Sequence, residues 1–440
     1  MGAETGRGPI GGTMPKIDDP RAFLSQLFHT AVAAADPMKT LKGNLPDRPK
    51  GRTIVIALGK GGAQLAAAFE TLWGAPVEGV VVTRYGYMAP CQHLPVLEAS
   101  HPVPDQAGLA ATKAVMAAVT GLTEDDLVVA LVCGGGSALL PAPPDGLTLE
   151  DEQALNAALL ASGAPIGVMN AIRKHVSQIK GGRLAQMAYP AKVVSPVVSD
   201  VPGDDPAQVA SGPTVPDEVS AEDARAMITA RKINLPERVM NHINSAACAA
   251  PVPGDPVFAR NEVRVIASAE FSLEAAAAQA RVKGIETVIL SDAIEGEAAD
   301  IGLMHAALAR QVLEKNRPFT APILMLSGGE TTVTLTGSAG RGGRNTAFLL
   351  GFAQAIDGCD GIHALAADTD GIDGSEDNAG SFADGRSMER LRTMGGDPQA
   401  FTAAQDPFGA FDMVDDIFYT GPTGTNVNDF RAILILPEND

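Results

Sequence analysis

The sequence is poor in aromatic residues, cysteine and positive charge. Aromatic side chains make up 4% of its 440 residues, and the four cysteines lie far apart, at Cys91, Cys133, Cys248 and Cys359. Without a C-x-x-C pair, neither a disulfide framework nor a structural zinc site is indicated, and a reducing compartment suits these thiols. No apolar run approaches the roughly 20 residues that cross a bilayer, and the glycine-rich residues 1–13 lack the pattern of a signal peptide. We therefore expect a cytoplasmic protein that does not enter a membrane.

Positive charge is scarce but unevenly placed. Lys and Arg number 33 against 52 Asp and Glu, and the net charge of −19 would repel a nucleic-acid backbone. Two stretches, residues 153–199 and 331–356, contain no acid at all. The first holds Arg173, Lys174, His175, Lys180, Arg183 and Lys192, and the second holds Arg341 and Arg344. A cleft lined by one sign of charge attracts its counter-ion, so these stretches predict sites for a small anion, with ordinary solvated faces as the alternative.

The length and the 45% hydrophobic content suffice for two cores, and apolar runs alternate with helical patterns. In the first half we expect strands at 53–58, 79–83, 127–133 and 192–198, and helices at 23–35, 63–72, 107–119 and 149–162. After the proline-rich residues 249–256, strands are expected at 263–267, 286–290, 323–326, 362–366 and 432–436, with helices at 272–282, 297–313 and 345–355. This alternation predicts α/β domains with parallel strands covered on both faces. The predicted units are a flexible extension (1–22), a first domain (23–250) and a second domain (257–440).

Ligands of open parallel sheets bind at the carboxyl ends of strands, and unusual turns follow several of the predicted strands. Residues 59–62 (GKGG) place Lys60 between glycines, where the start of the next helix could hold a phosphate. The turn is neither a P-loop nor a dinucleotide fingerprint, because Gln64 stands where the third glycine belongs. A purely structural turn with an exposed lysine is equally compatible with the pattern.

Two further glycine-rich turns share this position, and a third lies just before the last predicted strand. Consecutive glycines let the backbone approach a ligand and form a nest of N–H donors, although a tight turn with a serine N-cap has the same pattern. The residues that these turns offer for phosphate or substrate are Gly134, Gly135, Gly136 and Ser137, then Ser327, Gly328, Gly329 and Glu330, and finally Thr423 and Asn426.

The basic residues of the acid-free stretches add candidate anion ligands. On a helix, Asn170, Arg173 and Lys174 share one face, and arginine is the natural bidentate partner of a carboxylate. Lys180 and Arg183 flank a glycine pair in the same stretch, and we include both with Asn170 and Arg173 as candidate substrate ligands. Arg341 and Arg344 open a glycine-rich helix start that suits a phosphoryl group, with a solvent contact as the alternative for Arg341.

Two acidic loops, residues 199–205 and 368–377, offer hard oxygen ligands of the kind that Mg²⁺ takes together with substrate phosphates. We single out Asp200 and Asp370 as metal ligands. The second loop is not an EF-hand, because Ala379 occupies the twelfth position where a glutamate is needed. Aspartate-rich turns without metal are the alternative.

Taken together, the motifs resemble one family along nearly the whole chain from Phe23 onward. They are GKGG, CGGGSALL, NAIRKHVSQIKGGRLA, SDVPGDDPAQVASGPTVPD, SGGETTVTLTG, GRGGRN, DTDGIDG and TGPTGTNVND. The chain resembles the glycerate 2-kinase family, whose members are often labelled hydroxypyruvate reductases. The resemblance implies a Rossmann-like doubly wound parallel sheet, a smaller α/β domain called MOFRL, and an active site in the cleft between them. It also implies Mg²⁺-assisted transfer from ATP to the 2-hydroxyl of D-glycerate, with Lys60 and Arg344 or Arg341 as the catalytic cations.

On this hypothesis Lys60 and Arg344 flank the transferring phosphoryl group, and Arg173 or Arg183 holds the glycerate carboxylate. The partners expected are ATP and D-glycerate, without nucleic acid or membrane, and a homodimer stays open. Three alternatives remain: an NAD(P)H-dependent hydroxypyruvate reductase, a kinase for another small hydroxy acid, and a non-catalytic sensor of a sugar acid or nucleotide. The incomplete glycine fingerprint disfavours the reductase, and the two acidic loops disfavour the sensor.

Overall fold

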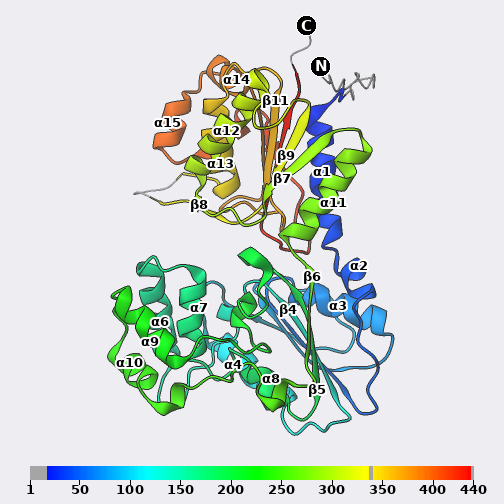
Figure 1. Ribbon diagram of the computed structural model, residues 1–440, viewed down its shortest axis with the longest axis vertical. Helices are drawn as coiled ribbons and strands as arrows, with labels where there is room; N and C mark the ends of the chain where they lie inside the picture. The colour runs from blue at the N-terminus through cyan, green and yellow to red at the C-terminus, as the bar shows by residue number, and fades with distance from the viewer. Residues whose placement is uncertain (1–16, 336–339, 438–440) are drawn as a thin grey trace, which may run out of the picture.

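The computed structural model describes residues 17–335 and 340–437 and contains two α/β units, one above the other in Figure 1. Within the described residues, the lower unit is built on a six-stranded, wholly parallel sheet. Its strands, in spatial order, are β3 (Val96–Ala99), β2 (Glu78–Arg84), β1 (Thr53–Leu58), β4 (Leu127–Cys133), β5 (Lys192–Val198) and β6 (Glu262–Ala267). The order 3-2-1-4-5-6 is that of the Rossmann fold, as the sequence predicted.

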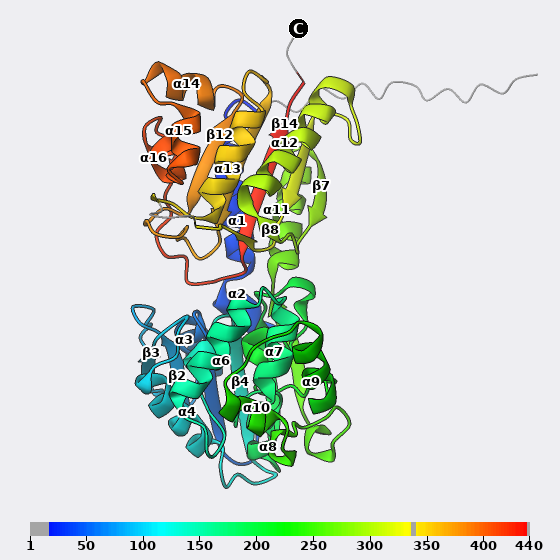
Figure 2. The same cartoon turned by 90° about the vertical axis from the view of Figure 1, so that its left-hand side faces the viewer.

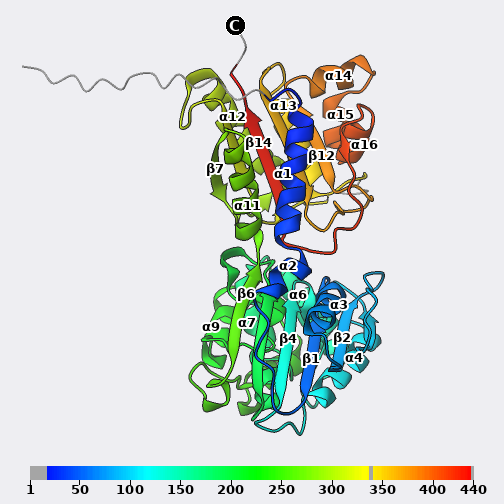
Figure 3. The same cartoon turned by 90° about the vertical axis from the view of Figure 1, so that its right-hand side faces the viewer.

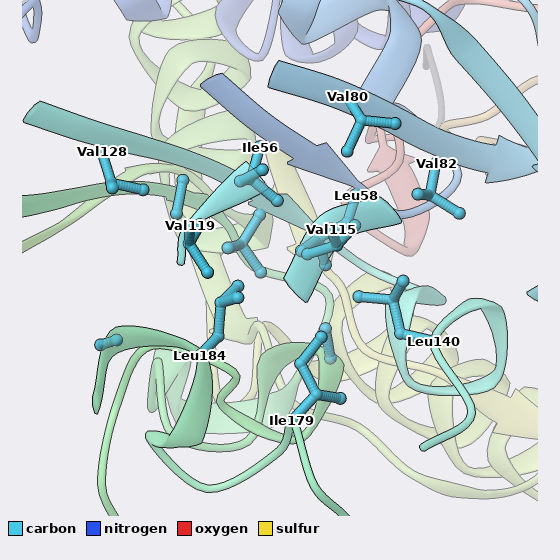
Figure 4. Packing of buried hydrophobic residues seen from close by; sticks show 14 of the residues in the cluster. Ile56, Leu58, Val80, Val82, Val115, Val119, Val128, Leu140, Ile179 and Leu184 are labelled. Carbon is cyan, nitrogen blue, oxygen red and sulfur yellow. The ribbon is translucent and has the colours of Figure 1, made fainter. Parts of the chain in front are cut away.

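Apolar side chains cover both faces of this sheet. Along β1, Ile56 and Leu58 face one core, and the alternate residues Val55 and Ala57 face the other. Figure 4 shows the first core, where Val115 and other helical side chains pack on the strands. The helices of this unit are α2 (Pro37–Lys42), α3 (Gly62–Trp73), α4 (Gln106–Ala118), α5 (Gly136–Leu139), α6 (Leu149–Ala161), α7 (Ile166–Lys174), α8 (Arg183–Ala188), α9 (Ala221–Ala230) and α10 (Glu237–Ile243). A parallel sheet sandwiched in this way needs nearly continuous apolar strands, which explains why the strands were predictable.

The upper unit has a mixed sheet. In spatial order its described strands are β13 (Ile417–Phe418), β12 (Gly380–Asp384), β11 (Ile362–Asp368), β14 (Asp429–Ile435), β9 (Ile323–Ser327) and β7 (Glu286–Ser291). The last strand in sequence, β14, is antiparallel to β11 and β9 on its two sides, and β7 is parallel to β9. A short pair, β8 (Gly296–Glu297) and β10 (Thr331–Thr332), lies apart. The start of β14 therefore lies at the same edge as the ends of β9 and β11.

Helices cover the two faces of this sheet. One face carries α12 (Ala298–Lys315) and α13 (Arg344–Ala355), and α14 (Ser387–Thr393), α15 (Pro398–Ala403) and α16 (Pro407–Asp412) lie beside α13 (Figure 2). The other face carries α1 (Pro20–Ala34) and α11 (Ala269–Val282) (Figure 3). In the described part of the chain, no helix is both long and apolar enough to cross a membrane.

Two segments lie in a different unit from the one that the sequence predicted. Helix α1, predicted in the first domain, packs its buried Leu24 and Phe28 into the core of the upper unit. Strand β6, predicted to start the second domain, pairs with β5 at the edge of the lower sheet. The predicted joint at residues 249–256 therefore lies before the last strand of the lower sheet, and the chain enters the upper unit only after Ala267. Most of the predicted N-terminal extension lies outside the described residues, but residues 20–22 are helical.

Asp126 directly precedes β4 and binds the backbone of Arg52, which directly precedes β1. Its buried carboxylate accepts hydrogen bonds from the backbone N–H of Arg52 at 2.7 Å and of Thr123 at 2.8 Å. Burial opposes ionisation of this carboxyl, but the hydrogen bonds outweigh it and lower its pKa to about 2. We predict that Asp126→Ala lowers the free energy of unfolding by about 3 kcal/mol, because two backbone N–H groups lose a charged acceptor.

Since the folded pKa lies below the ordinary value of 3.8, the ionised carboxylate stabilises the wild type above that pH, and the contribution is lost as the pH falls towards 2. Urea unfolding at pH 7 and at pH 3 checks both statements. An equal difference between wild type and variant at the two pH values would contradict the account.

Candidate functional site

The turns after β1 and β4 are bonded to each other at the carboxyl edge of the lower sheet. The backbone N–H of Lys60 donates to the carbonyl oxygen of Gly134 at 2.8 Å, and the N–H of Gly61 donates to the Sγ of Cys133 at 3.2 Å. Burial raises the pKa of the Cys133 thiol to about 12, so the sulfur stays protonated and acts as a structural link. The two glycine-rich turns thus form one rigid platform.

The glycines of the second turn make room for neighbouring side chains. A Cβ on Gly134 would lie 1.7 Å from Oδ2 of Asp200, and one on Gly135 would lie 2.9 Å from Cγ of Lys60. A Cβ on Gly136 would press on Leu58 and Ala210. The absent side chains therefore allow Lys60 and Asp200 to lie against this turn.

Lys60 and Asp200 interact electrostatically across this platform. Burial and the negative charge of Glu330 raise the pKa of Asp200 to about 6, and the positive charges of Lys60 and Arg344 oppose the rise. Within the described residues, the Lys60 ammonium has no hydrogen bond or ion pair. An unpaired cation beside a partly buried carboxylate is well placed to bind an anion.

The facing edge of the upper sheet carries a cluster of acids around Arg344. Its guanidinium donates to Asp429 at 2.7 Å, to Asp368 at 2.8 Å and to Glu330 at 3.1 Å. Burial opposes the charge, but these three carboxylates outweigh it and raise the pKa of Arg344. The register pairs Asp368 with Asp429, so both acids project from the same edge of adjacent strands.

Asp370 lies in the loop after β11, and its neighbour Thr369 is connected to Asp200 through Asn428. The side-chain amide of Asn428 donates to the backbone carbonyl oxygen of Asp200 at 2.6 Å. The backbone carbonyl oxygen of Asn428 accepts from the backbone N–H of Thr369 at 3.1 Å. Burial and the neighbouring charge of Asp370 raise the pKa of Asp368. The structure thus brings the two predicted acidic loops together at the boundary between the units.

The predicted turns of the upper unit have mixed roles. Ser327 is buried against Nε2 of His305 at 3.1 Å, and a Cβ on Gly329 would strike the backbone of Ile294. The carbonyl oxygen of Gly329 accepts from the backbone N–H of Asp429 at 3.1 Å, and the side chain of Glu330 accepts from Arg344, so this turn borders the acidic cluster. Thr423 and Asn426 lie in the turn that contacts the lower unit, where the carbonyl oxygen of Gly424 lies 3.9 Å from the Cβ position of Gly61.

In the lower unit, three predicted ligands form a connected chain. The hydroxyl of Ser137 lies 2.8 Å from that of Ser211, which donates to Oδ1 of Asn170 at 3.1 Å. The same oxygen accepts from Arg173 at 3.2 Å, and Arg173 also donates to Asn156 at 2.7 Å. These side chains support one another behind the CGGGS turn.

Lys180 and Arg183 do not join them. The ammonium of Lys180 is buried in an ion pair with Glu152 at 2.7 Å. Arg183 donates to four backbone carbonyl oxygens, among them those of Lys174 at 2.6 Å and Ala249 at 2.8 Å. Because these contacts direct both side chains into the protein, their predicted role as substrate ligands is not used in the proposals below.

Arg341 is likewise separate from Arg344. Its side chain is 51% exposed, lies 4.9 Å from the ring centre of Phe408 and pairs with Asp406 at 3.7 Å. Both contacts attach the Arg341 side chain to the start of α16. Of the two arginines that the sequence left as alternatives, Arg344 is therefore the one that we retain.

The buried ion pair between Lys180 and Glu152 leads to a prediction. Lys180→Met leaves the Glu152 carboxylate buried without its partner, and we expect the free energy of unfolding to fall by about 3–5 kcal/mol. Because the ammonium of Lys180 binds Glu152, the KM values of the folded enzyme for ATP and D-glycerate should stay within twofold of wild type. Chemical denaturation and steady-state kinetics test this, and the double variant Glu152→Leu with Lys180→Met should recover much of the stability. A large rise in a substrate KM with unchanged stability would restore Lys180 to the site.

Sequence reasoning missed three residues at this edge. His101 follows β3, a four-residue strand that no pattern predicted, and its Nε2 lies 3.4 Å from the Cβ position of Gly135. Arg84 ends β2 and stacks on Tyr87 at 4.2 Å from the ring centre. Asn428 adopts a left-handed backbone with φ of 64°, which asparagine tolerates. Arg84 could have been found, because it directly follows a predicted strand.

Two regions of the chain match known protein families. Residues 23–244 match the domain of unknown function DUF4147, and residues 323–429 match the MOFRL family. A D-glycerate 2-kinase of Thermotoga maritima is 37% identical over 93% of this chain and 97% of its own length.

A protein of Agrobacterium vitis that carries a provisional hydroxypyruvate reductase name is 49% identical over 94% of both chains. The crystal structure of glycerate kinase from Thermotoga maritima superposes with a TM-score of 0.84 at 36% identity, covering 94% of this chain and 99% of that one. The chain therefore belongs to the glycerate 2-kinase family, as a DUF4147 domain combined with a MOFRL domain.

Proposed function

We propose that the protein transfers the terminal phosphoryl group of ATP to the 2-hydroxyl of D-glycerate, giving 2-phosphoglycerate and ADP. The observation that carries the proposal is the side chain of Lys60. Its Cγ lies against the CGGG turn, and its ammonium, which is unpaired among the described residues, interacts electrostatically with Asp200. Phosphoryl transfer asks a protein mainly for positioning and charge neutralisation, so a covalent nucleophile is not needed. The relatives named as glycerate kinases support the same reaction class.

In this proposal Lys60 neutralises charge that develops on the transferring phosphoryl group, and Arg344 of the upper unit supplies a second positive charge. Arg344 cannot move freely, because three carboxylates bind its guanidinium. A preorganised cation of this kind pays no reorganisation cost during the reaction. The backbone of the CGGG turn keeps Lys60 in place.

The acids at the boundary between the units fit a divalent cation. Asp200 has no side-chain partner among the described residues, and Asp370 uses one oxygen for the backbone N–H of Ile372 at 2.9 Å. Their neighbours Glu330 and Asp368 leave the cluster with more negative than positive charge. We propose that Asp200 and Asp370 would hold Mg²⁺, which when bound would neutralise negative charge on the phosphates of ATP.

A coupled assay of ADP release tests the proposal. With Mg-ATP, ADP release should require D-glycerate and should stop when EDTA removes the metal. The related Agrobacterium protein makes hydroxypyruvate reduction the second candidate, so NADH and NADPH oxidation with hydroxypyruvate is measured on the same preparation. Gln64 disfavours this candidate, since it replaces the third glycine of the dinucleotide fingerprint at the start of α3. Reductase activity without kinase activity would overturn the proposal.

A further inference from the structure

Three neighbouring strands of the lower sheet each deliver a nitrogen-bearing side chain to the same edge. The register pairs Leu58 with Val82, and Lys60 and Arg84 each follow two residues later. Next along the sheet, Arg84 pairs with Ala99, and His101 follows two residues after that alanine. Because the strands are parallel, the three side chains are brought to one corner of the carboxyl edge.

Arg84 is available for an anion. In the described part of the chain it has no carboxylate partner and no hydrogen bond, and its guanidinium lies 4.2 Å from the ring centre of Tyr87. The stacked ring restrains the guanidinium without using its N–H donors. This is unlike Arg344, whose three nitrogens already donate to acids.

His101 is close enough to both cations to interact with them electrostatically. A Cβ on Gly135 would lie 3.4 Å from Nε2 of His101 and 2.9 Å from Cγ of Lys60, so both side chains contact the same glycine. Burial, and then the positive charges of Lys60 and Arg84, lower the pKa of His101 to about 4. At neutral pH the ring is therefore uncharged, and within the described residues neither ring nitrogen has a hydrogen-bond partner.

We propose that Arg84 and His101 form the subsite that binds the carboxylate of the small hydroxy acid. The guanidinium fork donates to both carboxylate oxygens, and the neutral imidazole adds one N–H donor. This inference rests on the proposed function and replaces the expected clamp by Arg173 or Arg183, whose donors the chain already uses.

The position of the subsite also explains which hydroxyl reacts. The 2-hydroxyl of glycerate is bonded to the carbon next to the carboxylate, and the 3-hydroxyl is one carbon further away. With the carboxylate held by Arg84 at the level of Lys60 in the sheet, the 2-hydroxyl is the one presented to the phosphoryl group beside Lys60. The subsite therefore selects acids with a hydroxyl on the adjacent carbon.

The test compares acceptors in the wild type, Arg84→Gln and Arg84→Lys. Arg84→Gln should raise the KM for D-glycerate about 100-fold and leave the KM for Mg-ATP within twofold, as expected for a lost charge-assisted pair. The lysine variant should lie between the two, since it keeps the charge and loses the fork. Arg48→Gln is the matched control, because Arg48 also stacks on an aromatic ring, that of Trp73 at 4.6 Å, and lies outside the site.

D-glyceramide, which replaces the carboxylate by a neutral amide, separates binding from misfolding. The wild type should prefer D-glycerate by about 100-fold in kcat/KM, and Arg84→Gln should lose most of this preference. An equal fall in kcat/KM for both acceptors would indicate a general structural defect and would overturn the proposal. A raised KM for Mg-ATP with an unchanged acceptor KM would assign Arg84 to the nucleotide phosphates and overturn it as well.

The two proposals can fail separately. If the wild type does not phosphorylate D-glycerate, the proposed function fails, and calorimetric binding of D-glycerate then tests the subsite alone. Weaker binding in Arg84→Gln than in Arg48→Gln would support the subsite, and equal binding would overturn it.

Discussion

Lys60→Ala is expected to lower kcat for glycerate phosphorylation about a thousandfold, the range seen when one preorganised donor to developing charge is removed. The reason is that the side chain of Lys60 lies with its Cγ against the CGGG turn, and its ammonium interacts electrostatically with Asp200. Its loss should cost little stability, because the ammonium has no partner within the described residues. Steady-state kinetics and thermal unfolding measure the two effects independently.

Lys113→Ala is the control for this experiment, since Lys113 is exposed on α4 of the same unit. Lys60→Arg should recover part of the activity, because it keeps the charge on a bulkier group. If Lys60→Ala retained more than about a tenth of the wild-type kcat, electrostatic stabilisation by this lysine would be too small for the role proposed.

Gly134→Ala is expected to lower kcat about 100-fold, the scale on which a displacement of about 1 Å damages a catalytic arrangement. The added Cβ would lie 1.7 Å from Oδ2 of Asp200, so the carboxylate must move. The side chain that gives way belongs to a loop, and we therefore expect the fold to persist while the metal-binding arrangement fails. Activity titrated against Mg²⁺ should show a higher requirement for the metal.

Gly167→Ala provides the matched control, because a Cβ at Gly167 meets nothing within 4 Å. That variant should keep full activity and the wild-type Mg²⁺ requirement. Full activity in Gly134→Ala would mean that the position of Asp200 has no bearing on the reaction, and the proposed metal site would have to be abandoned.

The parallel sheet was predictable because its strands are buried on both faces. Each of β1, β4 and β5 is a short apolar run closed by a turn, which the sequence displays directly. Helix α1 was assigned to the other unit, since its apolar stripe shows that one face is buried but not which sheet receives it. Strand β3 has no fully apolar run, and this hid His101.

Local charge predicted the site residues less reliably than apolar runs predicted the strands. The stretch that contains Lys174 and Lys180 has no acid of its own, which suggested unpaired cations. In the fold, Asp217 and Glu152 from outside the stretch pair with them. Local sequence composition cannot show such partners, because they come from residues far along the chain. The acidic loops, by contrast, each follow a predicted strand, β5 in the lower sheet and β11 in the mixed upper sheet, and both strands end at the boundary between the units.

One measurement tests the central claim most directly. Wild-type protein is incubated with Mg-ATP and D-glycerate, and the product is identified by ³¹P and ¹H NMR. The account predicts 2-phosphoglycerate formed in equal amount to ADP. Formation of 3-phosphoglycerate, or no phosphorylated acid at all, would contradict it.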